Sequence, residues 1–304
     1  MMRTWGSRLG MAALTAVLAV LGHPRQTQAE EPASASSIRI GLVNTLFRDT
    51  PESLVQLMTR PLKSLMESQT GMTGTLVPGG AAHNLGRQLV DDKFQLAVFQ
   101  GFEFAWVRQK HPELKPLVIA VRDGKPMYAC LVVRGDSPVN GMADLKGKSL
   151  AQCRQCREHC RLFIERRCES CGKDCQQFFA KITTPTDAED ALDDVVDGTV
   201  DAALVDGVAL ERYKKAKPDR FAKLKMALRS EPFPNAVIAY KPGALSDDTL
   251  DRFRNGLITA NRNAKGKQLL NMCRITCFEA IPDDYEQLLL NIAKVYPPPT
   301  EAGK

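Results

Sequence analysis

The chain alternates short apolar runs with amphipathic stretches over most of its length. In the first third, runs of strand length lie at residues 38–43, 75–77, 95–99 and 117–121. Between the first two runs, apolar residues recur every three or four positions after Pro51, and Gly71 ends this helical pattern. A turn is expected at Pro78–Gly80, and the later gaps also have helical spacing. This alternation is typical of an open α/β sheet with right-handed crossovers.

A second alternation begins near residue 129. Its expected strands are residues 129–133, 149–151, 182–183, 202–205, 224–228 and 236–240. The tail from Ser246 to Tyr296 is helical by pattern throughout, with Ser246 as a helix cap. Pro297–Pro299 is expected to end the ordered chain.

The first 29 residues have the pattern of an export signal. Arg3 and Arg8 precede an apolar run at residues 9–21, and the small residues of Thr27–Ala29 offer a cleavage site. This run of about 13 residues is shorter than the roughly 20 that a membrane-spanning helix needs. We predict that residues 1–29 are a cleaved signal peptide and that the mature protein is periplasmic. An uncleaved N-terminal anchor is the alternative.

Composition adds little that is specific to a function. Without the leader the formal net charge falls from +6 to +3 and about 275 residues remain, more than one core usually fills. We therefore expect two lobes in a monomer. No basic run interleaved with aromatic side chains points to nucleic acid as a partner. Because GxSxG and HExxH patterns are absent, we expect a binding protein and not an enzyme.

Polar residues follow two of the expected strands. Asn44 and Thr45 come after the first, and Gln100 follows the third, whose last residue is Phe99. Ligands of open α/β sheets bind beyond the carboxyl ends of the strands. We therefore place Asn44, Thr45, Phe99 and Gln100 near one mouth of a binding site.

The turn after residues 149–151 is polar and cationic, and a helix follows it. A helix N-terminus offers free backbone N–H groups to an anion. Arg154 and Arg157 add paired guanidinium donors that suit phosphate or carboxylate, with Gln155 and Cys156 between them. The turn is thus our main candidate for an anion site. In the alternative interpretation, both arginines are solvated charges on a basic helix.

Six of the nine cysteines lie in this segment as two triplets of equal spacing. They are Cys153, Cys156 and Cys160, then Cys168, Cys171 and Cys175. On one helix, three thiols at this spacing share a face. Three interpretations stay open: structural disulfides, a metal or cluster site formed by these cysteines, and a redox-active Cys153–Cys156 pair. Apart from that candidate metal, no cofactor is expected.

Three phrases of the sequence resemble a known family. They are IRIGLVNT at residues 38–45, QLAVFQGFEFAW at residues 95–106 and LVVRGDSPVNGMADLKGKSLA at residues 131–151. Together they resemble the periplasmic phosphate/phosphite/phosphonate-binding proteins of ABC importers, a branch of the type II periplasmic binding proteins. The resemblance covers most of residues 37–299, and it specifies the fold more strongly than the ligand.

The resemblance implies a type II periplasmic-binding-protein fold, in which two α/β lobes have a cleft and a hinge between them. Lobe one would combine residues 30–122 with residues 233–304, and lobe two would hold residues 123–232 with the Cys-rich helix. A small oxyanion such as phosphate, phosphite or a phosphonate would bind between the lobes, and an ABC permease in the membrane would be the partner.

The resemblance also carries over to single positions. In the family the anion sits on a Ser-Thr-Ser-Gly turn at a helix N-terminus of lobe two, and here Gln152–Arg157 stands in its place. Thr45 matches the polar residue after the first strand, and Phe99 falls where the family has a tyrosine. Asp206 would accept the ligand's own proton, and Asp187 lies near the position of a family histidine.

Two other functions stay open at this point. One is a Cys-ligated metal or redox protein on the same scaffold, and the other is a sensor domain that signals ligand occupancy without transport. A bound metal that is lost on mutating Cys153 and Cys156 would favour the first. A permease gene beside this one would favour import over sensing.

Overall fold

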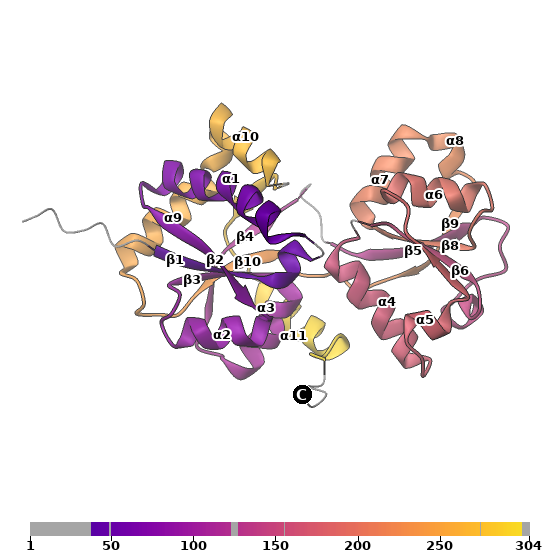
Figure 1. Cartoon of the computed structure of the whole chain (residues 1–304), viewed down its shortest axis with the longest axis horizontal. Helices are drawn as coiled ribbons and strands as arrows, with labels where there is room; N and C mark the ends of the chain where they lie inside the picture. Colours follow the sequence, from indigo (N-terminus) through magenta and orange to yellow (C-terminus); the bar gives the residue numbers. More distant parts are fainter. Residues whose placement is uncertain (1–37, 49, 123–126, 155, 274, 300–304) are drawn as a thin grey trace, which may run out of the picture. The chain divides into compact units, whose positions relative to one another are not determined.

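The computed structural model describes residues 38–48, 50–122, 127–154, 156–273 and 275–299 (Figure 1). The leader expected at residues 1–29 lies outside the described residues. The described residues belong to one compact unit, and their strands make two separate sheets.

One sheet has six strands in the order β11-β4-β10-β3-β1-β2. They are β1 (Ile38–Val43), β2 (Gly74–Gly80), β3 (Leu96–Phe99), β4 (Lys115–Val121), β10 (Ala236–Tyr240) and β11 (Cys277–Glu279). β1 pairs in parallel with β2 and β3, whereas β10 runs antiparallel to both β3 and β4. The carboxyl ends of β1, β3 and β4 therefore lie at the same edge of this sheet.

Helices cover both faces of the six-stranded sheet (Figure 1). On one face lie α1 (Glu52–Thr70), α9 (Asp247–Ile258) and α10 (Ala264–Met272). On the other lie α2 (Ala82–Val90), α3 (Gly101–Lys110) and α11 (Tyr285–Val295). Short 3-10 turns are η1 (Asn44–Phe47) and η3 (Ala260–Arg262).

The second sheet has five strands in the order β7-β6-β8-β5-β9. They are β5 (Ala129–Arg134), β6 (Ser149–Gln152), β7 (Lys181–Thr183), β8 (Ala202–Asp206) and β9 (Leu224–Arg229). Its helices are η2 (Ala143–Leu145), α4 (Glu158–Ser170), α5 (Cys175–Phe178), α6 (Ala188–Val196), α7 (Gly207–Ala216) and α8 (Pro218–Phe221). β6 is parallel to β7 and β8, so the ends of β6 and β8 share one edge.

Two chain segments link the sheets. The chain leaves the six-stranded sheet after β4 and returns to it between β9 and β10. The segments meet in an isolated antiparallel bridge, in which the Phe233 N–H donates to the carbonyl oxygen of Met127 at 2.6 Å.

Local sequence signals set several helix ends. Gly71 has a φ of 69° and its N–H donates to the Glu67 carbonyl, which ends α1 as predicted. The Ser246 side chain accepts the Thr249 N–H and caps α9, also as predicted. Asp187 and Asp206 cap α6 and α7 in the same way, so both aspartates are held at helix starts.

Two predicted elements are wrong. The expected turn at Pro78–Gly80 belongs to β2, because Gly80 pairs with Val43 of β1. The tail is not helical throughout, since Cys277–Glu279 forms β11, with Cys277 opposite Val121. A three-residue edge strand takes its conformation from its pairing partner more than from its own pattern. Among the described helices, none is long and apolar enough to cross a membrane.

Candidate functional site

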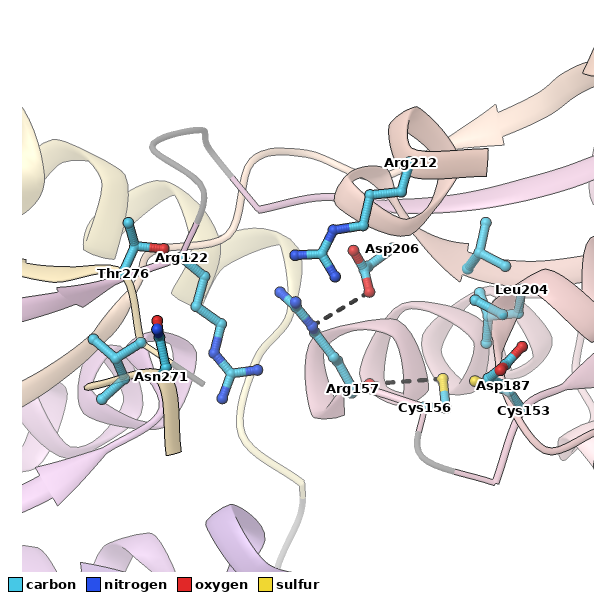
Figure 2. A pocket seen from close by; sticks show the side chains of 13 residues that line it. Arg122, Cys153, Cys156, Arg157, Asp187, Leu204, Asp206, Arg212, Asn271 and Thr276 are labelled. Atoms are coloured by element: carbon cyan, nitrogen blue, oxygen red, sulfur yellow. Dashed lines mark hydrogen bonds and ion pairs between the residues drawn. The ribbon is translucent and has the colours of Figure 1, made fainter. Parts of the chain in front are cut away.

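A cavity of about 530 Å³ is lined by residues from segments attached to both sheets (Figure 2). From the five-stranded sheet come the turn after β6 and the end of β8, with residues of α6 and α7 beside them. From the six-stranded sheet come the residue after β4, part of α10 and the segment leading into β11. We call this cavity the arginine pocket, because three arginines line it.

Arg122, Arg157 and Arg212 are these arginines. Arg122 follows β4, Arg157 is the N-cap residue of α4, and Arg212 lies on α7. Figure 2 shows the side chains of Arg122 and Arg157 extending toward one another into the pocket. The Arg157 side chain is 22% exposed, so its guanidinium is partly shielded from water. Guanidinium groups in such a site bind oxyanions through charge-assisted, paired hydrogen bonds.

Two carboxylates lie beside the arginines. Asp206 Oδ2 is 3.3 Å from Arg157 Nε, and Asp206 Oδ1 accepts the Ala209 N–H at 2.9 Å. Asp187 Oδ1 accepts backbone N–H groups of α6, which fixes this carboxylate at the pocket wall. Three guanidinium groups against two carboxylates leave these lining side chains with one excess positive charge, which favours an anion.

Two cysteine thiols complete the wall formed by the turn after β6. Cys153 and Cys156 line the pocket, and the Cys156 thiol donates to the carbonyl oxygen of Arg157 at 3.8 Å. The hydrogen bond with Cys156 and burial raise the pKa of Cys153 far above its ordinary value. Burial raises the pKa of Cys160 as well. These groups are therefore neutral thiols at physiological pH, and they offer weak S–H donors.

The cysteine triplets do not each share one helix face, contrary to the sequence prediction. Cys153 and Cys156 precede α4, because Arg157 has extended backbone angles and the helix starts at Glu158. Cys168 lies in the last turns of α4 and Cys171 is its C-cap, while Cys175 begins α5.

All nine thiols are free in this structure. Within the part of the chain that the structure describes, no group of three or more His, Cys, Asp or Glu side chains is arranged to hold a metal ion. The candidate metal set of six cysteines thus gains no support from the geometry.

The structure brings together four of the predicted ligand-binding residues. Cys156, Arg157, Asp187 and Asp206 line the arginine pocket, as does Cys153. Gln155 lies outside the described residues.

The other predicted residues do not line this pocket. They are Asn44, Thr45, Phe99, Gln100 and Arg154. Phe99 is fully buried against Phe104, with ring centroids 5.7 Å apart. Arg154 is exposed, and its backbone N–H donates to the Pro185 carbonyl at 2.9 Å.

Thr45 takes part in a separate polar cluster around the buried carboxyl group of Glu103. Its hydroxyl donates to Glu103 Oε2 at 2.7 Å, and Glu103 is only 4% exposed. Burial raises the pKa of Glu103 to about 7, against the lowering effect of the Thr45 hydrogen bond. Nearby, Arg48 pairs with Glu158 at 2.7 Å. This cluster satisfies its polar groups internally.

Sequence reasoning missed Arg122, Arg212, Asn271 and Thr276 as pocket residues. A signal existed for Arg122, because it directly follows the predicted strand at residues 117–121. Thr276 reaches the pocket because its N–H donates to the Val121 carbonyl at 2.8 Å, beside β11. That strand had no signal in the sequence, so Thr276 could not be found. Asn271 lies on α10, far along the chain from the other pocket residues, and no local pattern links it to them.

Comparison with solved structures places the chain in a known class. The structure of XAC2383 from Xanthomonas citri bound to chloride ion matches with a TM-score of 0.59 and 16% identity, over 86% of this chain and 97% of that one. PhnD1 from Prochlorococcus marinus in complex with methylphosphonate matches with a TM-score of 0.54 and 16% identity, over 86% and 98%. The fold is that of the type II periplasmic binding proteins, as predicted.

A third structure is a binding protein component of an ABC phosphonate transporter from Pseudomonas aeruginosa. It matches with a TM-score of 0.53 and 18% identity, over 86% of this chain and 88% of that one. The family described as "ABC transporter, phosphonate, periplasmic substrate-binding protein" matches residues 46–285, and the chain belongs to this family. No curated protein matches the chain.

Membership of this family confirms the main function predicted from the sequence. The chain is a substrate-binding protein of the ABC transporter type, which favours solute binding over a Cys-ligated metal or redox protein. Membership of this family implies a small-molecule ligand, a membrane permease as partner and a periplasmic location.

Proposed function

We propose that the protein captures a small oxyanion of the phosphonate or phosphate type in the arginine pocket and delivers it to an ABC permease. The observation that carries this proposal is the convergence of Arg122, Arg157 and Arg212 on one cavity beside Asp206. Phosphonate-binding relatives with the same fold support the choice of ligand class.

Each polar group has a part in this proposal. Arg157 presents a guanidinium fork to two oxygens of the anion, and Arg122 adds charge from the other sheet. Asp206 accepts a hydrogen bond from a proton that the ligand carries. Without that proton, the negative charges of the carboxylate and the anion would repel each other. Cys153 and Cys156 replace the hydroxyl donors of the Ser-Thr-Ser-Gly turn with weaker thiol donors.

The pocket volume bears on which oxyanion fits. About 530 Å³ lies within the range of about 300–1,000 Å³ that is usual for small-molecule sites. A bare tetrahedral oxyanion fills only part of it. The remaining space can hold a substituent on phosphorus, and we therefore favour a phosphonate over inorganic phosphate.

Two lobes would close on the ligand. We assign residues 30–122 and 233–304 to one lobe and residues 123–232 to the other. Sheet membership supports the division, because β10 and β11 join the sheet of β1–β4. The bridge between Met127 and Phe233 lies where the two linking segments meet, and so marks the expected hinge. We further propose a signal peptide at residues 1–29, a monomer, and no catalytic activity.

Ligand-dependent stabilisation tests the proposal. Purified protein is screened by thermal shift with phosphate, phosphite, methylphosphonate, sulfate and small carboxylates. A ligand at a hundred times its dissociation constant stabilises by about 2.7 kcal/mol, which is readily measured. We expect methylphosphonate or a close analogue to give the largest shift, and calorimetry then gives its affinity.

Two neighbouring arginines provide matched variants for that measurement. Arg157→Gln should weaken binding about a hundredfold, which corresponds to roughly 2.7 kcal/mol for lost hydrogen bonds to a charged ligand. Arg154→Gln removes the same charge from an exposed position outside the pocket and should leave the affinity unchanged. Equal affinities for both variants and the wild type would place the ligand elsewhere.

A further inference from the structure

Cys168 and Cys175 are in direct contact. The Cys175 thiol donates to Cys168 Sγ at a sulfur–sulfur distance of 2.9 Å. A disulfide bond is about 2.05 Å long, so the two sulfurs need to approach by less than about 1 Å to bond. The contact joins the end of α4 to the start of α5.

The turn between the two helices holds the pair in place. Gly172 has a φ of 75°, which lets the chain reverse directly after α4. Asp174 then caps α5 by accepting the Gln177 N–H at 2.8 Å. Both ends of the seven-residue step from Cys168 to Cys175 are therefore fixed by backbone geometry.

The remaining cysteines are engaged differently. Cys171 belongs to the same triplet but is exposed as the C-cap of α4. In the first triplet, the Cys156 thiol donates to the carbonyl oxygen of Arg157 at 3.8 Å. Cys277 donates its S–H to Glu279 Oε1 at 3.3 Å. Equal spacing in the sequence thus leaves one close pair in the second triplet, Cys168 with Cys175.

We propose that Cys168 and Cys175 are a redox modification site, which a small-molecule disulfide converts to an intramolecular disulfide. Cys168 is completely buried, whereas Cys175 is partly exposed and lines a second cavity of about 540 Å³ with Arg161 and Glu169. A small disulfide can therefore reach Cys175 first. Cys168 is then the resolving thiol.

The exchange has two balanced steps. In the first, the Cys175 thiolate attacks one sulfur of the small disulfide, which breaks its S–S bond and expels one small thiolate. In the second, the Cys168 thiolate attacks Cys175 Sγ of the mixed disulfide and expels the other small thiolate. The two cysteines lose two electrons and two protons, and the small disulfide becomes two thiols.

Peptide mapping tests the assignment. The full chain is reduced, freed of reductant, incubated with oxidised glutathione, and then alkylated and digested with trypsin without reduction. Trypsin cleaves after Arg167, Lys173 and Lys181, so a Cys168–Cys175 disulfide joins peptides 168–173 and 174–181. We expect this joined mass in most of the protein, with Cys171 alkylated. Separate, fully alkylated peptides would overturn the proposal.

Single substitutions identify the partner of Cys175. Cys171→Ser changes an exposed side chain and should leave the joined mass unchanged. Cys168→Ser should abolish it, provided that circular dichroism shows a folded variant. Loss of the joined mass in Cys171→Ser would assign the bond to Cys171 and overturn the proposal. Since that variant alters only the surface, this outcome stays decisive even if Cys168→Ser does not fold.

Discussion

The turns that follow the strands are built differently in the two sheets. After β6 and β8 of the five-stranded sheet, Arg157 and Asp206 carry charge into a cavity. After β1 and β3 of the six-stranded sheet, the half-buried Thr45 hydroxyl donates to the buried Glu103 carboxyl group. Both places are carboxyl ends of parallel strands, where ligands of α/β sheets bind.

The polar groups are paired at both strand ends, and what differs is their surroundings: Glu103 is buried by protein, whereas Arg157 and Asp206 line a cavity. Thr45 and Glu103 satisfy each other, so the protein itself supplies the partner that a ligand would otherwise provide. Arg157 meets Asp206 at 3.3 Å from a partly exposed position on the pocket wall. A substitution in either place should therefore affect a different property: stability in the first and ligand affinity in the second.

The largest expected effect concerns the charge of Glu103. Burial raises its folded pKa to about 7, above the ordinary value of 4.5. The folded state thus binds more protons than the unfolded state between these values, and stability falls as the pH rises through this window. Above pH 7, ionisation of the buried Glu103 lowers the free energy of unfolding by an amount on the order of 3 kcal/mol.

Glu103→Gln removes the ionisable proton and keeps an oxygen that can accept the Thr45 hydroxyl. The variant should resemble the wild type at low pH and exceed its free energy of unfolding above pH 7. Urea unfolding across this pH range measures the effect. Parallel pH profiles for the variant and the wild type would show that Glu103 ionises without cost.

The glycines after β3 and β8 show how closely the protein packs around each of the two turns. Each is the first residue of a helix, Gly101 of α3 and Gly207 of α7. A Cβ at Gly101 would lie 2.2 Å from the carbonyl oxygen of Pro234, which is backbone and cannot turn aside. At Gly207 the nearest atoms belong to the ring of Tyr128, which can move.

We expect Gly101→Ala to lower the free energy of unfolding by about 3 kcal/mol and Gly207→Ala by about 1 kcal/mol, within the usual range for overpacking. Chemical denaturation of both variants measures the difference. An equal cost for the two would mean that the turn after β3 is no more tightly closed than the turn after β8.

Asp206→Asn tests the charged turn through the protonation state of the ligand. Asn keeps an oxygen for the Ala209 N–H but removes the negative charge beside Arg157. The affinity of the variant for a singly protonated phosphonate should fall about tenfold, or roughly 1.4 kcal/mol. The doubly charged phosphonate should bind the variant better than it binds the wild type. Titration calorimetry at several pH values measures both affinities. A pH dependence equal to that of the wild type would show that Asp206 does not contact the ligand.

The alternation of the sequence was sufficient to predict open α/β sheets, whereas the type II periplasmic-binding-protein fold was predicted from the resemblance to a known family. Buried strands such as β1 and β3 are visible in the sequence as apolar runs, because their side chains face the core. Helix ends with a local signal, such as Gly71 and Ser246, were also predictable. β11 was not, because its three residues are strand only through pairing with β4.

The site was partly predictable for the same reason. Arg157 and Asp206 have local signals, since each stands between a strand and a helix. Asn271 and Thr276 arrive from a distant part of the chain, and no local pattern indicates that. Spacing alone also misplaced the cysteines, because the extended backbone at Arg157 separates Cys153 and Cys156 from α4.

The smallest expected effect is that of Thr45→Val, which removes the hydroxyl that Glu103 accepts. Valine has nearly the same shape, so the change isolates one hydrogen bond, and we expect a loss of about 1 kcal/mol in unfolding free energy. The loss should be larger above pH 7, because the hydrogen bond lowers the pKa of Glu103 and so favours its charged form. Ligand affinity should stay at the wild-type value, since Thr45 lies outside the arginine pocket. A weaker affinity in calorimetry, at unchanged stability, would instead make the turn after β1 part of the binding site and end the distinction between the two sheets.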